Sequence, residues 1–286
     1  MATSVQLRKG IPGDAEGCGR ICYRAFKTIA DQHNFPPDFP TPEIAVGVTG
    51  SLLSLPFVYA VVAESGGRIL GSNFLWEFSI AGVGPITVDP DVQNSTVGRQ
   101  LMKDVINRAA EKAFAGVRLV QAAYHNRSLC LYTKLGFDTR EPLSTMQGPA
   151  IKKAIPGCSV RPAKADDLAA CNDLCRAVHG HDRGMELQNA MTQGTATVAE
   201  REGLITGYAT LIGFFGHAVG KSNDDLKALI GAAPEFSGPG FLLPTRNGEL
   251  LRWCLEQGIR VVQPMTLMTM GMYQEPRGVF LPSILY

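Results

Sequence analysis

The sequence predicts an α+β (mixed α/β) protein made of two similar domains, and three observations support this. The chain has 286 residues, against roughly 150 for an ordinary domain. Strand-like and helix-like patterns alternate along it instead of forming separate blocks. The second half repeats motifs of the first half in the same order. We therefore expect domains at residues 1–150 and 158–286, joined by a polar linker at 151–157.

Three blocks carry the internal repeat. An arginine followed by two cysteines occurs in residues 8–22 and again 153 residues later. AVVAESGGRILG (60–71) resembles ATVAEREGLITG (196–207), at an offset of 136, and both indicate a β-hairpin with a glycine turn. An asparagine-to-glycine segment at 126–136 resembles the one at 247–258. Since the offset falls along the chain, the second copy is shorter in its middle.

Each element of the first half has a local reason. Apolar residues recur at helical spacing in 14–30 and again at every fourth position from Leu101 to Ala113, where Gly116 ends the pattern. The run FPPDFPTP excludes regular structure at 35–42, because proline cannot donate a backbone hydrogen bond. In chain order we expect a strand at 5–9, helices at 14–30 and 43–53, strands at 58–64, 68–78 and 83–88, a helix at 99–114, a strand at 117–123, a helix at 126–135 and a strand at 137–146.

Composition excludes several classes of protein. Apolar residues make up 45% and charged residues 19%, which suits a globular chain with a real core. The net charge of +1 argues against strong binding to nucleic acid or to acidic membranes. Seven cysteines without close ligand spacing favour free thiols, with neither a disulfide framework nor a metal site. Together with a start that lacks an apolar leader, this predicts a cytoplasmic protein.

The segment GPITVDPDVQNSTVGRQLM (84–102) is the one that indicates chemistry. A strand ends at Val88, Pro90 interrupts it, and a polar loop enters a helix near Gly98. Backbone N–H groups at the start of a helix have no partner inside the helix and attract anions. The segment therefore indicates a phosphate site, with an ordinary strand–turn–helix connection as the alternative.

This segment resembles motif A of the GNAT superfamily of acyl-coenzyme A N-acyltransferases, V-x-P followed by Q/R-x-x-G-x-G/A. Val88 and Pro90 match the first part, and Gln93, Thr96 and Gly98 occupy the second, with Thr96 where a glycine is usual. The segment from Asn126 to Phe137 is similar to motif B. The resemblance covers residues 4–148. It implies two tandem GNAT-like domains, each a mixed, mostly antiparallel twisted sheet flanked by helices.

The resemblance also implies roles for single residues. Backbone groups of one strand would pair with the pantetheine arm of acetyl-CoA, namely those of Ile86, Thr87 and Val88. The loop amides would hold the pyrophosphate, and they belong to Gln93, Asn94, Ser95, Thr96, Val97, Gly98 and Arg99. Asn126 would contact the pantetheine arm. Tyr132 is similar to the family's general acid, which protonates the departing thiolate.

Two further points stay open in the first half. The family's asparagine often precedes the tyrosine by seven residues, a position that His125 occupies here, and we favour Asn126 by residue type. A base must take the proton of the amine, whose pKa is about 10. Glu77 and Asp89 are candidates, with a solvated surface acid as the alternative for each, so we name no base.

The second half resembles a degenerate GNAT domain. Residues 219–226 lack the motif A pattern, and Asp224 and Asp225 at a helix start would repel phosphates. Cys254 stands at the tyrosine position. We expect no acetyl-CoA site there. The segment 216–222 is one residue short of an ATP-binding loop, and we assign no metal to the paired cysteines or to His179 and His181.

The sequence therefore predicts an acetyl-CoA-dependent N-acetyltransferase that transfers the acetyl group directly to a primary amine. The alternative is a non-catalytic acyl-CoA-binding or sensing protein. The acceptor is open between small-molecule and peptide amines, and we expect neither nucleic acid nor membrane as a partner. The oligomeric state is also open, with a homodimer as one alternative.

Overall fold

The computed structural model describes residues 4–93 and 96–285, which form two compact units. The N-terminal unit contains the described residues up to Thr139, together with Met268–Met272 and Leu285. The C-terminal unit contains Arg140–Leu267 and Tyr273–Ile284. The units divide after Thr139, while the domain boundary at 151–157 stays a prediction from the sequence.

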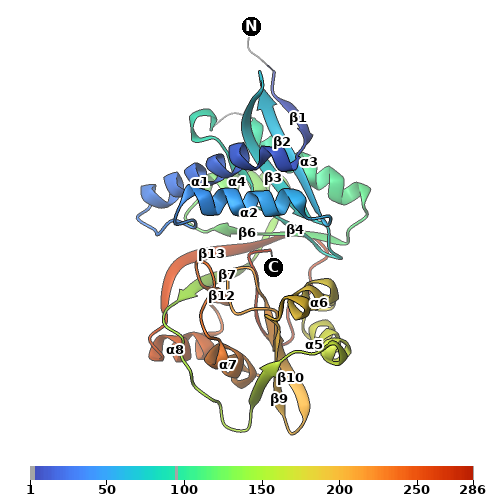
Figure 1. Ribbon diagram of the computed structural model, residues 1–286, viewed down its shortest axis with the longest axis vertical. Coiled ribbons are helices and arrows are strands. Elements are labelled where there is room, and N and C mark those ends of the chain that lie inside the picture. Colours follow the sequence, from blue (N-terminus) through green and yellow to red (C-terminus); the bar gives the residue numbers. More distant parts are fainter. Residues whose placement is uncertain (1–3, 94–95, 286) are drawn as a thin grey trace. The chain divides into compact units, whose positions relative to one another are not determined.

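The N-terminal unit alternates strands and helices (Figure 1). Its elements are β1 (Gln6–Lys9), α1 (Ala15–Gln32), α2 (Pro42–Ser54), β2 (Val58–Ser65), β3 (Arg68–Trp76), β4 (Ala81–Val83), β5 (Thr87–Val88), α3 (Val97–Glu111), β6 (Gly116–Ala122) and α4 (Asn126–Lys134). Short 3-10 turns at Pro12–Asp14 and Pro90–Val92 precede α1 and α3.

The sheet of this unit has the order β1-β2-β3-β4-β6. Its neighbours are antiparallel except for β4 and β6, which are parallel. The stretch Met268–Met272 lies beside β6, where the Met272 N–H donates to the Ala115 carbonyl at 2.8 Å. A segment from the far end of the chain thus completes the N-terminal sheet.

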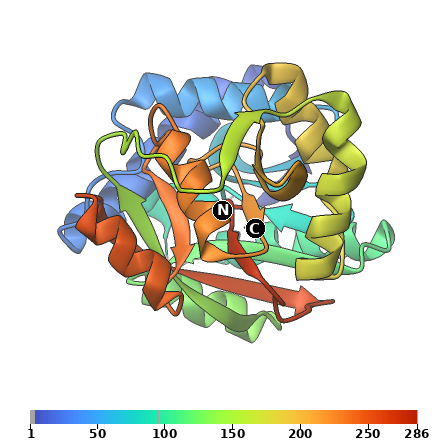
Figure 2. The same cartoon turned by 90° about the horizontal axis from the view of Figure 1, so that it is seen from below.

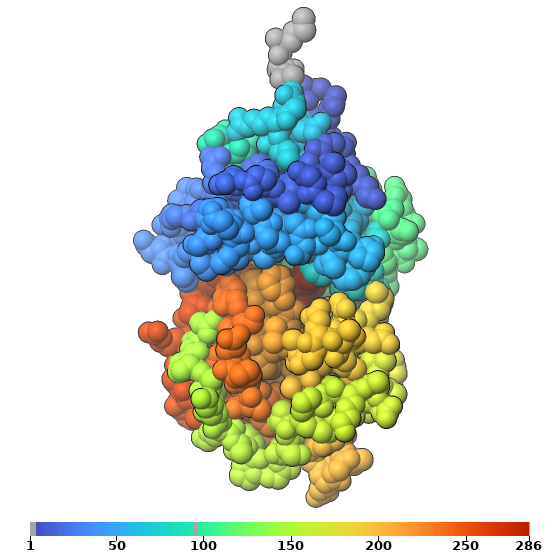
Figure 3. All heavy atoms as spheres, viewed as in Figure 1, coloured from blue at the N-terminus to red at the C-terminus, as the bar shows by residue number. Residues whose placement is uncertain are grey.

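Helices cover both faces of the sheet, because successive strand residues point to opposite sides. Val61 shares a core cluster with Leu101 of α3, whereas its neighbour Ala60 shares another with Leu52 of α2. Figure 1 shows α1 and α2 in front of the strands of this sheet, and Figure 3 shows their atoms, in blue, at the surface of the unit. A strand with a continuous apolar run is therefore buried on both faces of the sheet, and the core consists of two layers.

The C-terminal unit repeats this order. Its elements are β7 (Asp138–Gln147), β8 (Ser159–Pro162), α5 (Leu168–His179), α6 (Gly184–Gln193), β9 (Thr197–Arg201), β10 (Leu204–Ala209), β11 (Ala218–Gly220), α7 (Asn223–Ala232), β12 (Phe241–Pro244), α8 (Gly248–Glu256), β13 (Arg260–Gly271) and β14 (Val279–Leu281).

This unit holds a five-stranded sheet and a second group of strands. The sheet has the order β14-β11-β10-β9-β8, and the other group has the order β13-β7-β12. Val198 packs with Cys171 of α5, and the adjacent Ala199 packs with Leu226 of α7 on the opposite face. Figure 2 shows α5 (yellow-green) and α8 (red-orange) on different sides of this unit.

The internal repeat is visible in the hairpins. The pairing of β2 with β3 shifts register between Ala63 and Glu64, opposite Gly71. The pairing of β9 with β10 shifts between Ile205 and Gly207, at the equivalent place. The predicted fold class, mixed α/β with two similar domains, is confirmed.

One predicted strand is interrupted. Residues 83–88 form two short strands instead, with a break at 84–86. Pro85 has no N–H to donate to the neighbouring β3, and Gly84 has a φ of 140°, outside the strand region. This break separates β4, which pairs with β6, from β5, which pairs with β3.

Two findings concern the cysteines and the helices. All seven cysteines lie in the described part of the chain, and all are free thiols. Among the described residues, no helix is both long enough and apolar enough to cross a membrane.

Candidate active site

The break between β4 and β5 opens one edge of the sheet. β4 pairs with β6 at Ala81 and Gly82, but among the described residues β5 pairs only with β3. The Asp89 N–H donates to the Leu70 carbonyl at 2.8 Å, so the backbone groups of Val88, one residue earlier, point away from β3. Within the described part of the chain, the Val88 carbonyl accepts one long hydrogen bond, from the Gln93 side chain at 3.4 Å. Such an edge can pair with an amide-bearing ligand.

The start of α3 lies directly after this edge. Asn94 and Ser95, two of the predicted loop residues, fall outside the described residues. Thr96 immediately precedes the helix, and its hydroxyl accepts from the Gln100 side chain at 2.8 Å instead of capping the backbone. Its φ of −82° is ordinary right-handed backbone, so its Cβ causes no strain there. Threonine in place of glycine is thus compatible with the backbone conformation at position 96.

Gly98 is not needed by the fold itself. A Cβ at this position would lie 3.5 Å from a Val88 methyl and 3.8 Å from a Leu131 methyl, which are ordinary contacts. Arg99, one residue later, is exposed. A glycine that the packing does not require, at a helix start beside an open strand edge, leaves room for a ligand close to the backbone.

Asp89 anchors the turn that leads into this loop. It is 2% exposed, accepts from the Asp91 N–H, and forms ion pairs with Arg24 at 3.2 Å and Arg68 at 2.5 Å. Burial opposes its ionisation, but these hydrogen bonds and charges lower the pKa of the Asp89 carboxyl overall. A carboxylate held this firmly in its ionised form is a structural anchor and a poor base.

Glu77 also forms an ion pair with an arginine. Its carboxylate accepts from the Arg108 guanidinium of α3 at 2.7 Å, and the side chain is 18% exposed. Neither acidic candidate for the base is therefore the solvated surface acid that the sequence offered as an alternative, and both are tied to arginines.

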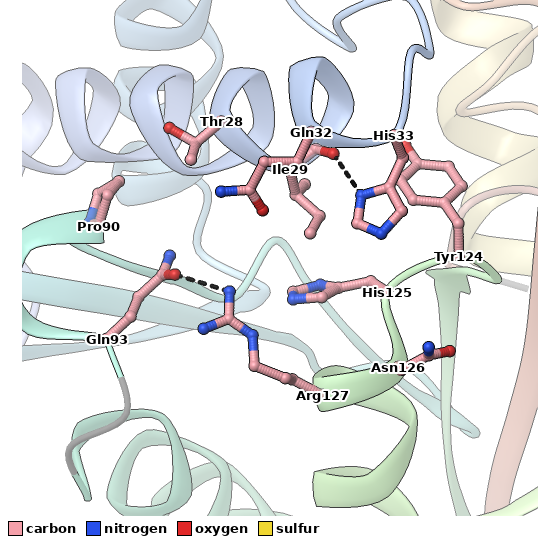
Figure 4. A pocket seen from close by; sticks show the side chains of 10 residues that line it. All are labelled: Thr28, Ile29, Gln32, His33, Pro90, Gln93, Tyr124, His125, Asn126 and Arg127. Carbon is pink, nitrogen blue, oxygen red and sulfur yellow. Dashed lines mark hydrogen bonds between the residues drawn. The ribbon is translucent and has the colours of Figure 1, made fainter.

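A pocket of about 390 Å³ lies between the end of α1, the turn before α3 and the start of α4 (Figure 4). It is lined by Thr28, Ile29, Gln32, His33, Pro90, Gln93, Tyr124, His125, Asn126 and Arg127. The Arg127 guanidinium donates to the Gln93 side chain at 2.9 Å, which joins two sides of the pocket. Gln93 and Asn126 belong to the predicted set, and the structure brings them to this one cavity.

Asn126 and Tyr132 differ in their exposure. Asn126 begins α4 and is exposed, and Figure 4 shows its amide directed away from His125 and Arg127. Tyr132 is 6% exposed and packs in the core against Phe137. Burial raises the pKa of Tyr132 to about 12, although a hydrogen bond with Ser128 lowers it in part. The phenol is therefore protonated at neutral pH.

His125 and His33 are pocket residues that the sequence did not assign. Figure 4 shows the His125 ring projecting into the pocket from the start of α4. Its Nδ1 lies 2.7 Å from the Ser128 hydroxyl. His33 closes the end of α1, where its Nδ1 lies 2.9 Å from the Ile29 carbonyl. The seven-residue spacing from His125 to Tyr132 was the available signal, but residue type favoured Asn126. No local feature of the sequence indicates that the end of α1 and the start of α4 line the same pocket.

Part of the N-terminal unit matches a known protein family. Residues 57–139 match the family model described as an acetyltransferase (GNAT) domain. This stretch contains the open edge, the start of α3, and α4. The N-terminal unit carries a GNAT domain. No curated protein sequence matches the chain significantly.

Solved structures show that the GNAT fold extends over nearly the whole chain. A proposed acetyltransferase of Pyrococcus horikoshii superposes with a TM-score of 0.73 at 17% identity, covering 96% of this chain and 94% of that one. A GCN5-related N-acetyltransferase of Sphaerobacter thermophilus gives 0.63 at 17% identity, with 95% and 96% covered. A tandem GNAT protein from clavulanic acid biosynthesis gives 0.54 at 14% identity, with 94% and 98% covered. These likenesses concern the fold.

The C-terminal unit closes its equivalent helix start with its own side chains. Ser222 precedes α7, and its N–H and hydroxyl both donate to Asp225 at 2.8 Å. Thr206 and Arg201 also donate to Asp225, which is 1% exposed. Cys254, at the position of the GNAT tyrosine, is fully buried in α8. A carboxylate thus lies where the GNAT domain of the first unit has an uncapped loop.

Within the described residues, no group of three or more histidine, cysteine or acidic side chains could hold a metal ion.

Proposed function

We propose that the GNAT domain transfers the acetyl group of acetyl-CoA directly to a primary amine. The observation that carries this proposal is the juxtaposition of two features: among the described residues β5 pairs with β3 alone, and the Thr96 side chain does not cap the start of α3. An amide-bearing arm that ends in a pyrophosphate matches both features. A strand edge pairs with amides, and helix N–H groups bind phosphate oxygens.

The predicted residues divide into three tasks under this proposal. The backbone of Ile86, Thr87 and Val88 aligns the pantetheine arm along the open edge. The turn from Gln93 to Arg99 holds the pyrophosphate, with Gly98 giving it access to the backbone. Asn126 contacts the pantetheine arm, and Tyr132 donates its proton to the leaving thiolate.

The pocket beside this edge receives the acceptor. None of its ten lining residues, all of which are described, is acidic, and Arg127 is the one permanent cation among them. An amine that carries a carboxylate or another anionic group elsewhere fits such a lining better than a polycation does. We propose acceptors of this kind, such as amino acids or unblocked peptides.

The experiment is a transfer assay with acetyl-CoA and a panel of amines: lysine, a short unblocked peptide, spermidine and kanamycin. The acetylated amine is measured by mass spectrometry, because Cys130 is an exposed free thiol that would react with thiol reagents. Acetylation of lysine or the peptide in preference to spermidine is the expected result. Binding of acetyl-CoA without acetylation of any amine would favour the non-catalytic sensing protein instead.

A further inference from the structure

A chain of hydroxyl and imidazole groups runs along α4 from the core to the pocket. Ser128 and Tyr132 are four residues apart, on the same face of the helix, and hydrogen bonding by the Ser128 side chain lowers the pKa of Tyr132 in part. The Ser128 hydroxyl lies 2.7 Å from His125 Nδ1. His125 precedes the first residue of α4, so its ring stands at the helix end that faces the pocket.

Of these three side chains, His125 lines the pocket, and Ser128 and Tyr132 do not. Because Ser128 occupies Nδ1, the nitrogen left for a ligand in the pocket is Nε2. The other charged or titratable groups in the lining are His33 from α1, Tyr124 from the preceding turn and Arg127 from α4. No carboxylate lines the pocket, and its two imidazole groups are those of His125 and His33.

Burial, with the nearby Arg127 and His33, lowers the pKa of His125 to about 4. The ring is therefore neutral at neutral pH and has a free lone pair. A ring with this pKa is a weak base, so His125 takes a proton at Nε2 only as it passes its Nδ1 proton to Ser128.

Tyr132, in contrast to His125, has a raised pKa and gives up its proton with difficulty. A thiolate whose conjugate thiol has a pKa of about 8.5 is a weaker base than a buried tyrosinate, since the pKa of Tyr132 is about 12. Donation of its proton is unfavourable unless another proton arrives as the first one leaves. Ser128 is the group placed to supply it.

We propose that His125 takes the proton of the acceptor amine and returns it, through Ser128, to Tyr132, so that one relay serves both the base and the acid of the reaction. This inference rests on the proposed acetyl transfer. His125 is a catalytic residue under this proposal, since it contacts the amine, and Ser128 is the relay between it and Tyr132.

The protons balance in one turnover. The acceptor reacts as the neutral amine, after its ammonium form has lost one proton to solvent. Its nitrogen bonds to the acetyl carbon and loses a second proton to His125 Nε2, while Nδ1 gives its proton to Ser128. The Ser128 hydroxyl proton passes to Tyr132, and the Tyr132 proton passes to the sulfur as the carbon–sulfur bond breaks. The products are the N-acetyl amine and free CoA, and Ser128 and Tyr132 are restored. His125 ends in its other tautomer, which exchange with solvent resets.

The test compares Ser128→Ala with Ser128→Thr in the full chain. Both are assayed with acetyl-CoA and whichever amine of the panel the unaltered protein acetylates. We expect Ser128→Ala to lower kcat roughly 10²-fold, while Ser128→Thr, which keeps a hydroxyl, stays close to the unaltered protein. Equal loss in both variants would contradict the relay and indicate a packing role for Ser128.

A second variant tests the histidine. His125→Ala should lose activity to a similar extent and regain part of it when free imidazole is added, because imidazole can enter the vacated space and carry the proton. Cys130→Ser, an exposed position on the same helix, is the control and should leave kcat unchanged. Calorimetric titration with acetyl-CoA checks that each variant still binds the co-substrate.

The outcomes separate this relay from the proposed function. Acetyl transfer by the unaltered protein, with Ser128→Ala equally active, would overturn the relay and leave the proposed function standing. Acetyl-CoA binding without transfer to any amine would overturn both. Loss in His125→Ala without any rescue by imidazole, together with full activity of Ser128→Ala, would make His125 an acceptor-binding residue only.

Discussion

Each unit has one arginine, Arg8 or Arg161, that joins the turn before a long helix to a neighbouring strand, and the two make equivalent bonds. Arg8 donates to Asp14 at 2.8 Å with two nitrogens and to Glu64 at 2.7 Å. Arg161 makes the equivalent bonds to Asp167, at 2.7 and 2.9 Å, and to Glu200. The ion-pair network therefore repeats together with the sequence.

This network predicts a pH-dependent contribution to stability. The hydrogen bonds from Arg8 lower the pKa of the Asp14 carboxyl in the folded state, against the cost of burial. Its stabilisation is therefore present above the unfolded pKa of about 4 and is lost as the pH falls through the lower folded value. We expect Asp14→Asn to reduce the free energy of unfolding by about 1–2 kcal/mol at pH 7, and by less near pH 3. Denaturant unfolding at both pH values measures this.

The control for that prediction is Glu16→Gln. Glu16 pairs with Arg20 on the surface of α1, where the two side chains are 63% and 58% exposed. Such a pair contributes little. A loss in Asp14→Asn that is the same at every pH would show that the carboxylate acts through packing and not through its charge.

Tyr132→Phe tests the proposed general acid. The substitution removes one hydroxyl, which bonds to Ser128, and leaves the ring in its core position beside Phe137. We expect kcat to fall roughly 10²- to 10⁴-fold, with acetyl-CoA affinity unchanged. Activity within a few-fold of the unaltered protein would remove Tyr132 from the mechanism.

Single residues were predictable where motif and spacing agree. Val88, Gln93 and Gly98 were predicted from the motif, and the structure places them around one helix start. His125 could not be ranked above Asn126, because its Nδ1 contact with Ser128 depends on how the chain turns into α4. Residue type alone does not record that turn.

At the scale of elements, two glycines on either side of β5 make opposite demands. A Cβ on Gly71 of β3 would clash with the Thr87 carbonyl oxygen, whereas a Cβ on Gly98 of α3 would make only ordinary contacts. The first glycine serves the close approach of β3 and β5. The second leaves space at the helix start.

We therefore expect Gly98→Ala and Gly71→Ala to behave differently. Gly98→Ala should unfold at the same or a higher temperature, since alanine is favoured over glycine in helices by about 1 kcal/mol, and should bind acetyl-CoA more weakly. Gly71→Ala should lower the unfolding temperature, because the backbone must move. Thermal unfolding and calorimetric binding measure the two effects. Equal acetyl-CoA affinity in Gly98→Ala would show that the glycine does not serve the ligand.

Most elements were predictable because their periodicity is strong, as in α1 and α3. The predicted strand at 83–88 was not found whole, because Gly84 and Pro85 interrupt its pairing with β3. An apolar pattern predicts a strand but not the strands with which its backbone pairs. The sequence therefore could not show that β5 leaves one edge open.

At the scale of the whole molecule, the N-terminal unit depends on residues from the far end of the chain. Met268 is fully buried in the same cluster as Leu119, and Met272 bonds to the Ala115 carbonyl. A linear reading of the repeat does not predict that residues 268–272 join the N-terminal unit.

This dependence predicts the behaviour of a fragment. Residues 1–150 expressed alone should lack a cooperative unfolding transition, since β6 loses its neighbour and the core cluster loses Met268. Circular dichroism during heating, compared with the full chain, measures this. A fragment with the full chain's unfolding temperature would show that Met268–Met272 is dispensable.

The most direct test of the account is a calorimetric titration of the full chain with acetyl-CoA, read for stoichiometry. The uncapped start of α3 predicts one site per chain, lost in Gly98→Arg, which fills the space at the helix start. The capped start of α7 predicts that Asp224→Arg, a surface change beside Asp225, keeps that one site. No binding, two sites per chain, or full affinity in Gly98→Arg would contradict the assignment of acetyl-CoA to the N-terminal unit.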